Sequence, residues 1–121
     1  VGYKGGGLWF KSDYKNGKQV GPYVSYFKNG SLYTKGIHKG NGKKEGLWYT
    51  YHDNGQISQT GYYENGKKEG KWLWYWDSGS VLEEGDYKNG KKEGLWRAFG
   101  RNGIKDKDYS GIYHKGVKIS N

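Results

Sequence analysis

The fold is decided by the stretch Tyr63-Glu64-Asn65-Gly66-Lys67-Lys68-Glu69-Gly70-Lys71-Trp72-Leu73-Trp74-Tyr75. The dipeptide Asn65-Gly66 predicts a tight turn, because both residues tolerate the positive φ angles of a two-residue hairpin loop. The aromatic residues on either side are typical of β-strands. Asn-Gly occurs seven times in the 121 residues, mostly between segments of strand length. This pattern predicts an antiparallel meander of about nine or ten strands.

The stretch spans the junction between two copies of an internal repeat. The copies begin at Gly21, Gly46, Gly70 and Gly94, which follow one another at intervals of 25, 24 and 24 residues. An extra residue near 40–42 accounts for the longer first interval. A fixed period of this length is typical of an array of stacked supersecondary units. We interpret residues 1–121 as a single array, divided into a half copy at 8–20, full copies at 21–45, 46–69, 70–93 and 94–118, and a tail at 119–121.

The composition narrows the fold class. Hydrophobic residues make up only 32% of the chain, but aromatic residues make up 18%, and disordered chains are poor in aromatics. Because Tyr and Trp bury large areas while keeping a polar group, their rings can form a thin core. The 23 glycines and the lack of a helical apolar period argue against helices. The expected fold is all-β, an elongated single-layer antiparallel meander of stacked β-hairpins.

A strand register follows if Asn54-Gly55 forms a two-residue turn. The pairs that this turn predicts are Trp48–Gly61, Thr50–Gln59 and His52–Ile57, and an equivalent turn in the next copy predicts Trp72–Gly85 and Trp76–Val81. A tryptophan across from a strand glycine compensates for the packing that the glycine lacks. This arrangement explains why glycine recurs inside the predicted strands as well as in the turns.

Alternation of side chains along a strand places one row of large rings on the same face. No helix is expected to cover either face, so the sheet must curl into a self-packed trough, pair with a second copy as a homodimer, or offer a face to a partner. We expect the row to bind a protein partner. The expected partner-binding face consists of Tyr23, Trp48, Trp72, Trp74, Trp76 and Trp96.

Paired lysines recur at one set of turns. Stacking of the copies lines them into a basic stripe at one edge of the sheet, in a chain with a net charge of +9. The stripe either docks an acidic protein or another polyanion, or simply keeps solvated turns apart. Nucleic acid is disfavoured as a partner, because the lysines lie at turns while the rings lie in mid-strand. The stripe consists of Lys43, Lys44, Lys67, Lys68, Lys91 and Lys92.

The sequence offers no catalytic or metal-binding constellation. His38, His52 and His114 occupy non-equivalent positions in the repeat, and the lack of cysteine excludes thiol catalysis and cysteine-ligated metals. The segment Gly61–Lys68 imitates a phosphate-binding loop, but it lacks the Ser or Thr after lysine and the following helix. We therefore predict no catalytic residue, no metal, no cofactor and no enzymatic activity.

The combination Gly-Lys-Trp-x-x-Tyr followed by Tyr-x-Asn-Gly-Lys-Lys-Glu-Gly, seen at Gly70–Tyr75 and Tyr87–Gly94, closely resembles the bacterial variant of the MORN repeat. The chain is similar to arrays known as YwqK-type antitoxins or as exported 24-residue repeat proteins, and the resemblance extends from about Tyr14 to Lys118. It implies an elongated sheet of stacked hairpins and a scaffold for protein binding or dimerisation. A phospholipid-binding role is also implied for some members.

These observations predict a non-enzymatic protein-binding repeat module, in one version an antitoxin or immunity protein that masks a cognate toxin. The alternative is a cell-envelope module that contacts glycan or anionic phospholipid through its aromatic rows and lysine stripe. The chain starts at Val1 and contains no Met, so we expect its natural start to lie upstream, as a removed signal peptide or a longer array. A bacterial protein of the cell envelope or outside the cell is favoured over a cytoplasmic one.

Overall fold

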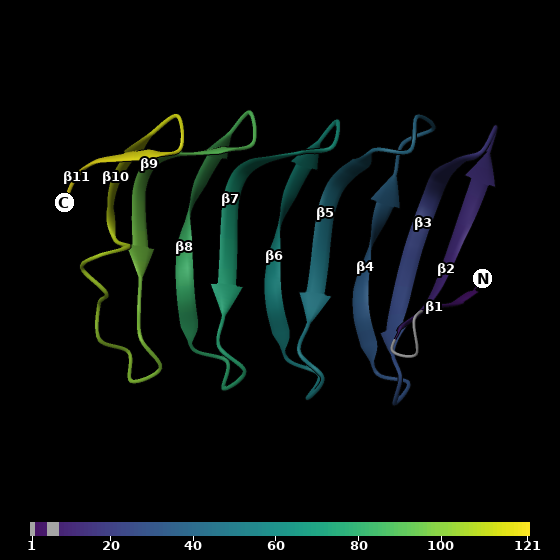
Figure 1. The fold of residues 1–121 in the computed structure, drawn as a ribbon, viewed down its shortest axis with the longest axis horizontal. Helices are drawn as coiled ribbons and strands as arrows, with labels where there is room; N and C mark the ends of the chain where they lie inside the picture. The colour runs from purple at the N-terminus through teal and green to yellow at the C-terminus, as the bar shows by residue number, and fades with distance from the viewer. Residues whose placement is uncertain (1, 5–7) are drawn as a thin grey trace.

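The computed structural model describes residues 2–4 and 8–121, which form one open antiparallel sheet (Figure 1). The described residues contain eleven strands, each paired with its neighbours in chain order. The strands are β1 (Gly2–Lys4), β2 (Leu8–Lys15), β3 (Lys18–Phe27), β4 (Leu32–His38), β5 (Lys44–Tyr51), β6 (Ile57–Glu64), β7 (Lys67–Tyr75), β8 (Val81–Lys88), β9 (Lys91–Ala98), β10 (Gly111–His114) and β11 (Val117–Ser120).

The all-β, single-layer meander predicted from the sequence is therefore confirmed. The strand count is higher than the expected nine or ten, since the short strands β1 and β11 extend the sheet at its two ends. Nowhere in the described residues is there a helix long and apolar enough to cross a membrane.

Two kinds of short turn join most of the strands, one at each edge of the sheet, and a longer connection at 99–110 joins β9 to β10 (Figure 1). The first edge, at the top of Figure 1, carries the two-residue turns Asn16-Gly17, Asn65-Gly66, Asn89-Gly90 and Lys115-Gly116, in which both residues have positive φ. These are the tight turns that the sequence predicts. A three-residue loop at 40–42, closed by a 2.9 Å hydrogen bond from the Gly42 amide to the Lys39 carbonyl, holds the extra residue of the first copy. We call this edge the lysine edge.

The opposite edge carries three-residue loops, and the predicted register is wrong for the residue pairs next to these loops. The Gly55 amide donates to the His52 carbonyl at 3.0 Å, and Gly55 alone takes a positive φ while Asn54 does not. The Asn54 side chain instead accepts the Gln56 amide at 2.9 Å. A loop that is one residue longer shifts the pairs nearest the turn, so that Ile57 pairs with Tyr51 and Val81 with Tyr75, not with His52 and Trp76. The inner pairs Trp48–Gly61, Thr50–Gln59 and Trp72–Gly85 are confirmed.

The glycine that begins each copy bends its strand. Gly46, Gly70 and Gly94 have φ angles of 78°, 69° and 80°, which a residue with a side chain adopts only with strain. The strand register shifts beside each of them, as expected for a β-bulge. The bends lie near the lysine edge (Figure 1) and turn the first residues of β5, β7 and β9 over one face of the sheet. We call this face, which carries Trp48, Trp72 and Trp96, the ring face, and we call the opposite face the outer face.

Each repeated tryptophan lies flat on a strand glycine of the ring face. A Cβ atom on Gly36, Gly61 or Gly85 would overlap the indole of Trp48, Trp72 or Trp96 respectively. The sequence predicted tryptophan beside glycine, and the register with the following strand is as predicted. The ring itself, however, leans back onto the glycine of the preceding strand. Each glycine is therefore the floor on which the next tryptophan rests.

Replacing one of these glycines should disrupt the core of its copy. We expect Gly61→Ala to destabilise the protein by about 3 kcal/mol, because the added methyl group must displace the Trp72 ring. Gly40→Ala is the control, since no atom lies within 4 Å of a Cβ at Gly40 and its φ is not positive. Urea unfolding should place Gly40→Ala within about 0.5 kcal/mol of the native chain. Equal midpoints for the two variants would contradict this packing.

Candidate binding groove on the ring face

A continuous row of rings crosses the sheet on the ring face. Neighbouring rings meet edge to face, with centroids 5.0–6.4 Å apart and interplanar angles of 70–88°. This geometry suits the aromatic quadrupole, and each such pair adds about 0.5–1.5 kcal/mol beyond burial. The ring ladder consists of Tyr23, His38, Trp48, Tyr63, Trp72, Tyr87, Trp96 and Tyr113.

The repeated tryptophans are the core of the protein. Trp48, Trp72 and Trp96 are 4%, 1% and 0% exposed. Each indole Nε1 donates a hydrogen bond of 3.0–3.1 Å to a strand carbonyl. Trp72 and Trp96 therefore offer almost no surface to a partner, whereas Trp48 lines the groove described below. A single-layer sheet has no second layer to pack against, so its largest rings are buried within the sheet's own bend.

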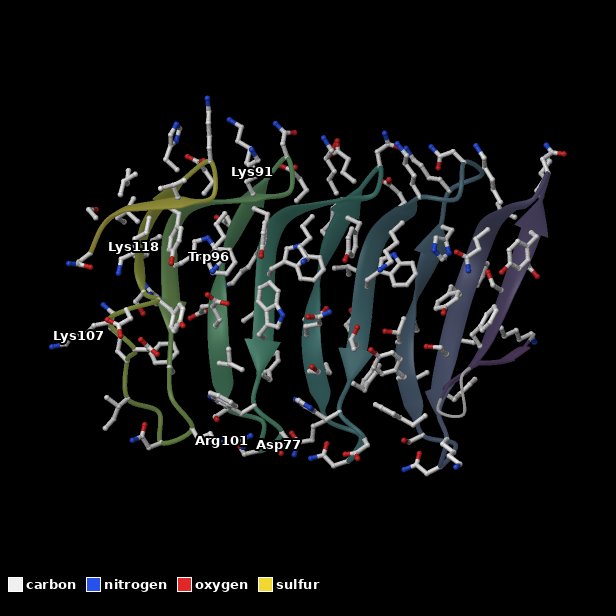
Figure 2. The ribbon with its side chains drawn as sticks, viewed as in Figure 1. Asp77, Lys91, Trp96, Arg101, Lys107 and Lys118 are labelled. Atoms are coloured by element: carbon white, nitrogen blue, oxygen red, sulfur yellow. The ribbon has the colours of Figure 1, made fainter. Side chains whose placement is uncertain are left out.

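The other members of the predicted face have different surroundings. Tyr23 is half-buried, and its ring centroid lies 5.7 Å from that of Trp48. Trp74 is half-buried too and packs on Trp72 at 5.7 Å. Trp76 lies near the edge opposite the lysine edge, where it donates to the Phe99 carbonyl at 3.1 Å. The guanidinium of Arg101 covers the Trp76 ring at 4.6 Å and pairs with Asp77 at 2.7 Å (Figure 2).

The predicted lysine stripe is divided into two rows. The inner lysines are Lys44, Lys68 and Lys92, whose ammonium groups lie 4.8, 5.2 and 4.5 Å from the ring centres of Trp48, Trp72 and Trp96. Cation–π attraction is strongest where the cation is partly desolvated, as it is here. The premise that lysines and rings lie apart is therefore wrong for this row. The inner lysines cover the ring ladder.

The outer lysines are Lys43, Lys67 and Lys91, and they are exposed along the lysine edge. Their aliphatic stems pass beside the turn glycines Gly66, Gly90 and Gly116 of the next copy. Figure 2 shows Lys91 pointing away from the sheet, whereas Trp96 lies over it. This row keeps the predicted character of a basic edge.

The glutamate after each lysine pair holds the next turn in place. Glu45 accepts the Asn65 amide at 2.7 Å, and Glu69 accepts the Asn89 amide at 3.0 Å. Charge-assisted hydrogen bonds of this kind are stronger than neutral ones. Glu45, Glu69 and the equivalent Glu93 thus connect successive copies, a role that the sequence analysis did not assign.

An open groove of about 430 Å³ lies on the ring face of the first two copies. Its walls carry ring faces and its floor carries hydroxyl and amide groups, with the Oγ1 atoms of Thr34 and Thr50 2.9 Å apart. Pockets that bind ligands combine apolar walls with a few polar groups in the same way. The groove is lined by Phe10, Gln19, Tyr23, Ser25, Tyr33, Thr34, His38, Lys44, Trp48, Thr50 and Gln59.

Basic groups line the groove. Burial, and then the charge of Lys44, lowers the pKa of His38 below its usual 6.5. Burial, and then the charge of Lys68, lowers the pKa of Lys44 as well. His38 is 6% exposed, and its Nδ1 atom is buried without a hydrogen-bond partner among the described residues. Because no Asp or Glu lines the groove, it favours a neutral or anionic group.

The sequence analysis missed most of this groove. Of the predicted site residues, only Tyr23, Trp48 and Lys44 line it. Its polar floor was not recognised, because Ser25, Thr34 and Gln59 read as ordinary alternating strand residues. One signal was available: Thr50 and Ser25 stand where the third copy has Trp74.

Two further histidines, His52 and His114, lie outside the groove. No group of three or more His, Asp or Glu side chains in the described ranges 2–4 and 8–121 has the geometry to hold a metal ion. His52 bonds to the Tyr75 carbonyl at 2.9 Å, and His114 to Glu93 at 3.0 Å. Both histidines are therefore engaged within the sheet.

The buried histidine should make the protein sensitive to acid. Since the folded pKa of His38 is lowered, the unfolded chain binds more protons as the pH falls below 6.5, and stability decreases there. We expect His38→Tyr, which restores the residue of the other copies, to reduce the loss of stability between about pH 7.5 and pH 5. Urea unfolding at both pH values measures this. The same loss in both proteins would show that His38 is not the source.

Residues 44–65 and 68–89 each match the family model of the MORN repeat variant. None of the curated proteins compared with the chain matches it. Each matched segment runs from an inner lysine, past the buried tryptophan, to the asparagine of the next tight turn. MORN repeats are non-catalytic modules that bind proteins or membrane lipids. The chain thus contains two repeats of the MORN variant, in the segment that holds Trp48 and Trp72.

Proposed function

We propose that this chain is a non-enzymatic repeat module that binds a protein partner in the groove of its ring face. The observation that carries the proposal is the groove itself, which combines half-buried rings with hydroxyl and amide groups over about 430 Å³. Its opening on one side of a rigid sheet suits a segment of polypeptide, since backbone amides and side chains can use the polar floor and the rings together.

Rigidity of the sheet favours such binding. The groove is built on β2–β6, whose positions are set by ladder hydrogen bonds and by the buried Trp48. A preformed site loses little conformational entropy when a partner docks. The groove can therefore give useful affinity from a small contact area.

The outer lysines support a second candidate function. Lys43, Lys67 and Lys91 are exposed at one edge, and the adjacent glutamates are occupied by turn amides. This edge suits anionic phospholipid or an acidic envelope glycan, each lysine contributing about 1 kcal/mol near an anionic surface. In that case binding depends on the lysine edge and not on the groove.

A finer version of the first proposal is that the partner is a toxin, which the chain masks as an antitoxin or immunity protein. What supports it is the resemblance of the motif at Tyr87–Gly94 to arrays of that kind. A toxin encoded beside this chain should form a complex with it and lose its activity in that complex. A neighbouring toxin that neither binds nor is inhibited would remove this version and leave the general proposal in place.

The two candidates can be separated by one pair of substitutions. Thr34 lines the groove, whereas Leu47 lies on the outer face and is 55% exposed. Peptides selected from a random displayed library on the native chain should bind Thr34→Arg at least about tenfold more weakly, and should bind Leu47→Arg unchanged. Vesicles containing phosphatidylglycerol should bind neither the native chain nor the variants appreciably.

The contrary result is equally clear. Binding to those vesicles that is lost when Lys43, Lys67 and Lys91 are changed to Gln, together with peptide binding that ignores Thr34→Arg, would reject the groove and favour the lysine edge. Circular dichroism should first show that each variant keeps its β-structure.

A further inference from the structure

One position of the repeat on the ring face differs in size between the copies. Ser25, Thr50, Trp74 and Ala98 stand at equivalent places in the four copies. In the third copy the residue is a large ring, and in the others it is small. The residues that flank Thr50 are of the same types as those that flank Trp74, whereas Tyr23, His38 and Gln19 replace Trp, Tyr and Lys around Ser25.

In the third copy the ring of Trp74 fills the space over its neighbours. Its centroid lies 5.7 Å from Trp72, 6.1 Å from Tyr87 and 6.0 Å from Trp96, at tilts of 34–53°. The ammonium group of Lys68 lies 5.6 Å from the Trp74 ring. An indole in this position is therefore held by three rings and one cation.

In the second copy the same surroundings enclose no ring. Their counterparts are Trp48, Tyr63, Trp72 and Lys44, and together with Thr50 they line a hollow of about 30 Å³. This hollow shares Trp48, Thr50 and Lys44 with the larger groove, so the two adjoin.

The first copy repeats the arrangement. The counterparts of the residues around Trp74 are Tyr23, His38, Trp48 and Gln19, and all four line the groove beside Ser25. The groove thus occupies the place of the Trp74 ring in the first copy and adjoins the smaller hollow at that place in the second copy.

From this correspondence we infer that the groove binds an aromatic side chain of a partner polypeptide, which lies against Trp48 between Ser25 and Thr50, as Trp74 lies against Trp72 and Trp96. The small residues at positions 25 and 50 leave the site open, and Trp74 closes the equivalent site in the third copy. Trp74 is itself an aromatic side chain, and it fills the equivalent place in the third copy. The inference rests on the proposed protein-binding function and specifies what the groove recognises.

The polar groups of the groove suit such a ring. Lys44 already lies 4.8 Å from the Trp48 ring and 5.0 Å from the Tyr63 ring, as Lys68 lies near three rings in the next copy. A bound ring would place a further π-face beside Lys44. The hydroxyl groups of Thr34 and Thr50 can accept the N–H of an indole or the O–H of a phenol.

The test uses N-acetyl-tryptophanamide as the probe and N-acetyl-leucinamide as its aliphatic counterpart. Amide and indole NMR signals of the full chain should shift on titration with the aromatic probe at Thr34, Thr50, Gln59 and the Nε1–H of Trp48. The leucine probe should bind at least about tenfold more weakly.

Two tryptophan substitutions make a matched pair. Thr50→Trp should close the site and abolish these shifts, because Thr50 is flanked by Thr34 and Gln59, which are no larger than the Gln59 and Glu83 that flank Trp74. Leu47→Trp adds the same ring at an exposed position of the outer face and should leave the shifts unchanged. Thr50→Phe replaces Thr50→Trp if the latter does not fold.

Three outcomes would overturn the inference. Equal binding of the two probes would mean that the groove takes any apolar side chain, and the proposed function would survive. Saturable binding of methyl β-D-glucopyranoside at the same amides, tighter than the aromatic probe, would assign the ring walls to a sugar. Binding of the aromatic probe that Thr50→Trp does not weaken would place it elsewhere. Failure of the proposed function itself shows separately, as the lack of peptides that depend on Thr34.

Discussion

The contact of a tryptophan ring with a strand glycine is the constraint on which the rest of this structure depends. A single-layer sheet has no second layer to bury its apolar side chains, and a thin core must come from within the sheet. Gly36, Gly61 and Gly85 remove the Cβ atom that would otherwise hold each indole off the backbone. Since each ring rests on the preceding strand, every copy contributes the floor for the next one.

This dependence on neighbours explains the other repeated residues. The glycine that begins each copy bends its strand so that the lysine after the tight turn reaches back over the buried ring. The glutamate that follows the lysine accepts an amide of the next turn, some 20 residues further along the chain. Ring, cation and carboxylate therefore all act between adjacent copies, as in other linear repeat arrays. The inner lysines and the glutamates thus serve stacking, whereas the outer lysines are exposed along the lysine edge.

Much of this arrangement could be predicted from the sequence, and the failures have particular physical causes. Asn65-Gly66 predicted a two-residue turn correctly, because both of its residues take positive φ. Asn54-Gly55 looks the same in the sequence, but its asparagine uses its side chain as an acceptor and stays at negative φ. Local sequence does not separate these two outcomes, and one extra loop residue shifts the pairs beside the turn. The burial of the tryptophan rings was harder to predict than the turns, because alternation assigns Trp48 to a face but does not show that this face bends over the ring.

The same distinction governs where function can arise in a repeat of this kind. Most residues that obey the period are needed for stacking, and a ring as fully buried as Trp96 offers no surface to a partner. Tyr23 and Trp48 obey the period too, but they line the groove and can contact a partner there. Positions free to vary are those whose side chains no neighbouring copy requires. Ser25, Thr50, Trp74 and Ala98 form such a position. The ring of Trp74 fills the ring face in the third copy, whereas Ser25 and Thr50 line the groove. Ala98 is small too, but it is buried, and Ser110 bonds to its amide and carbonyl groups. In an array held together by repeated contacts, specificity must therefore come from departures from the repeat, and the groove lies at such a departure.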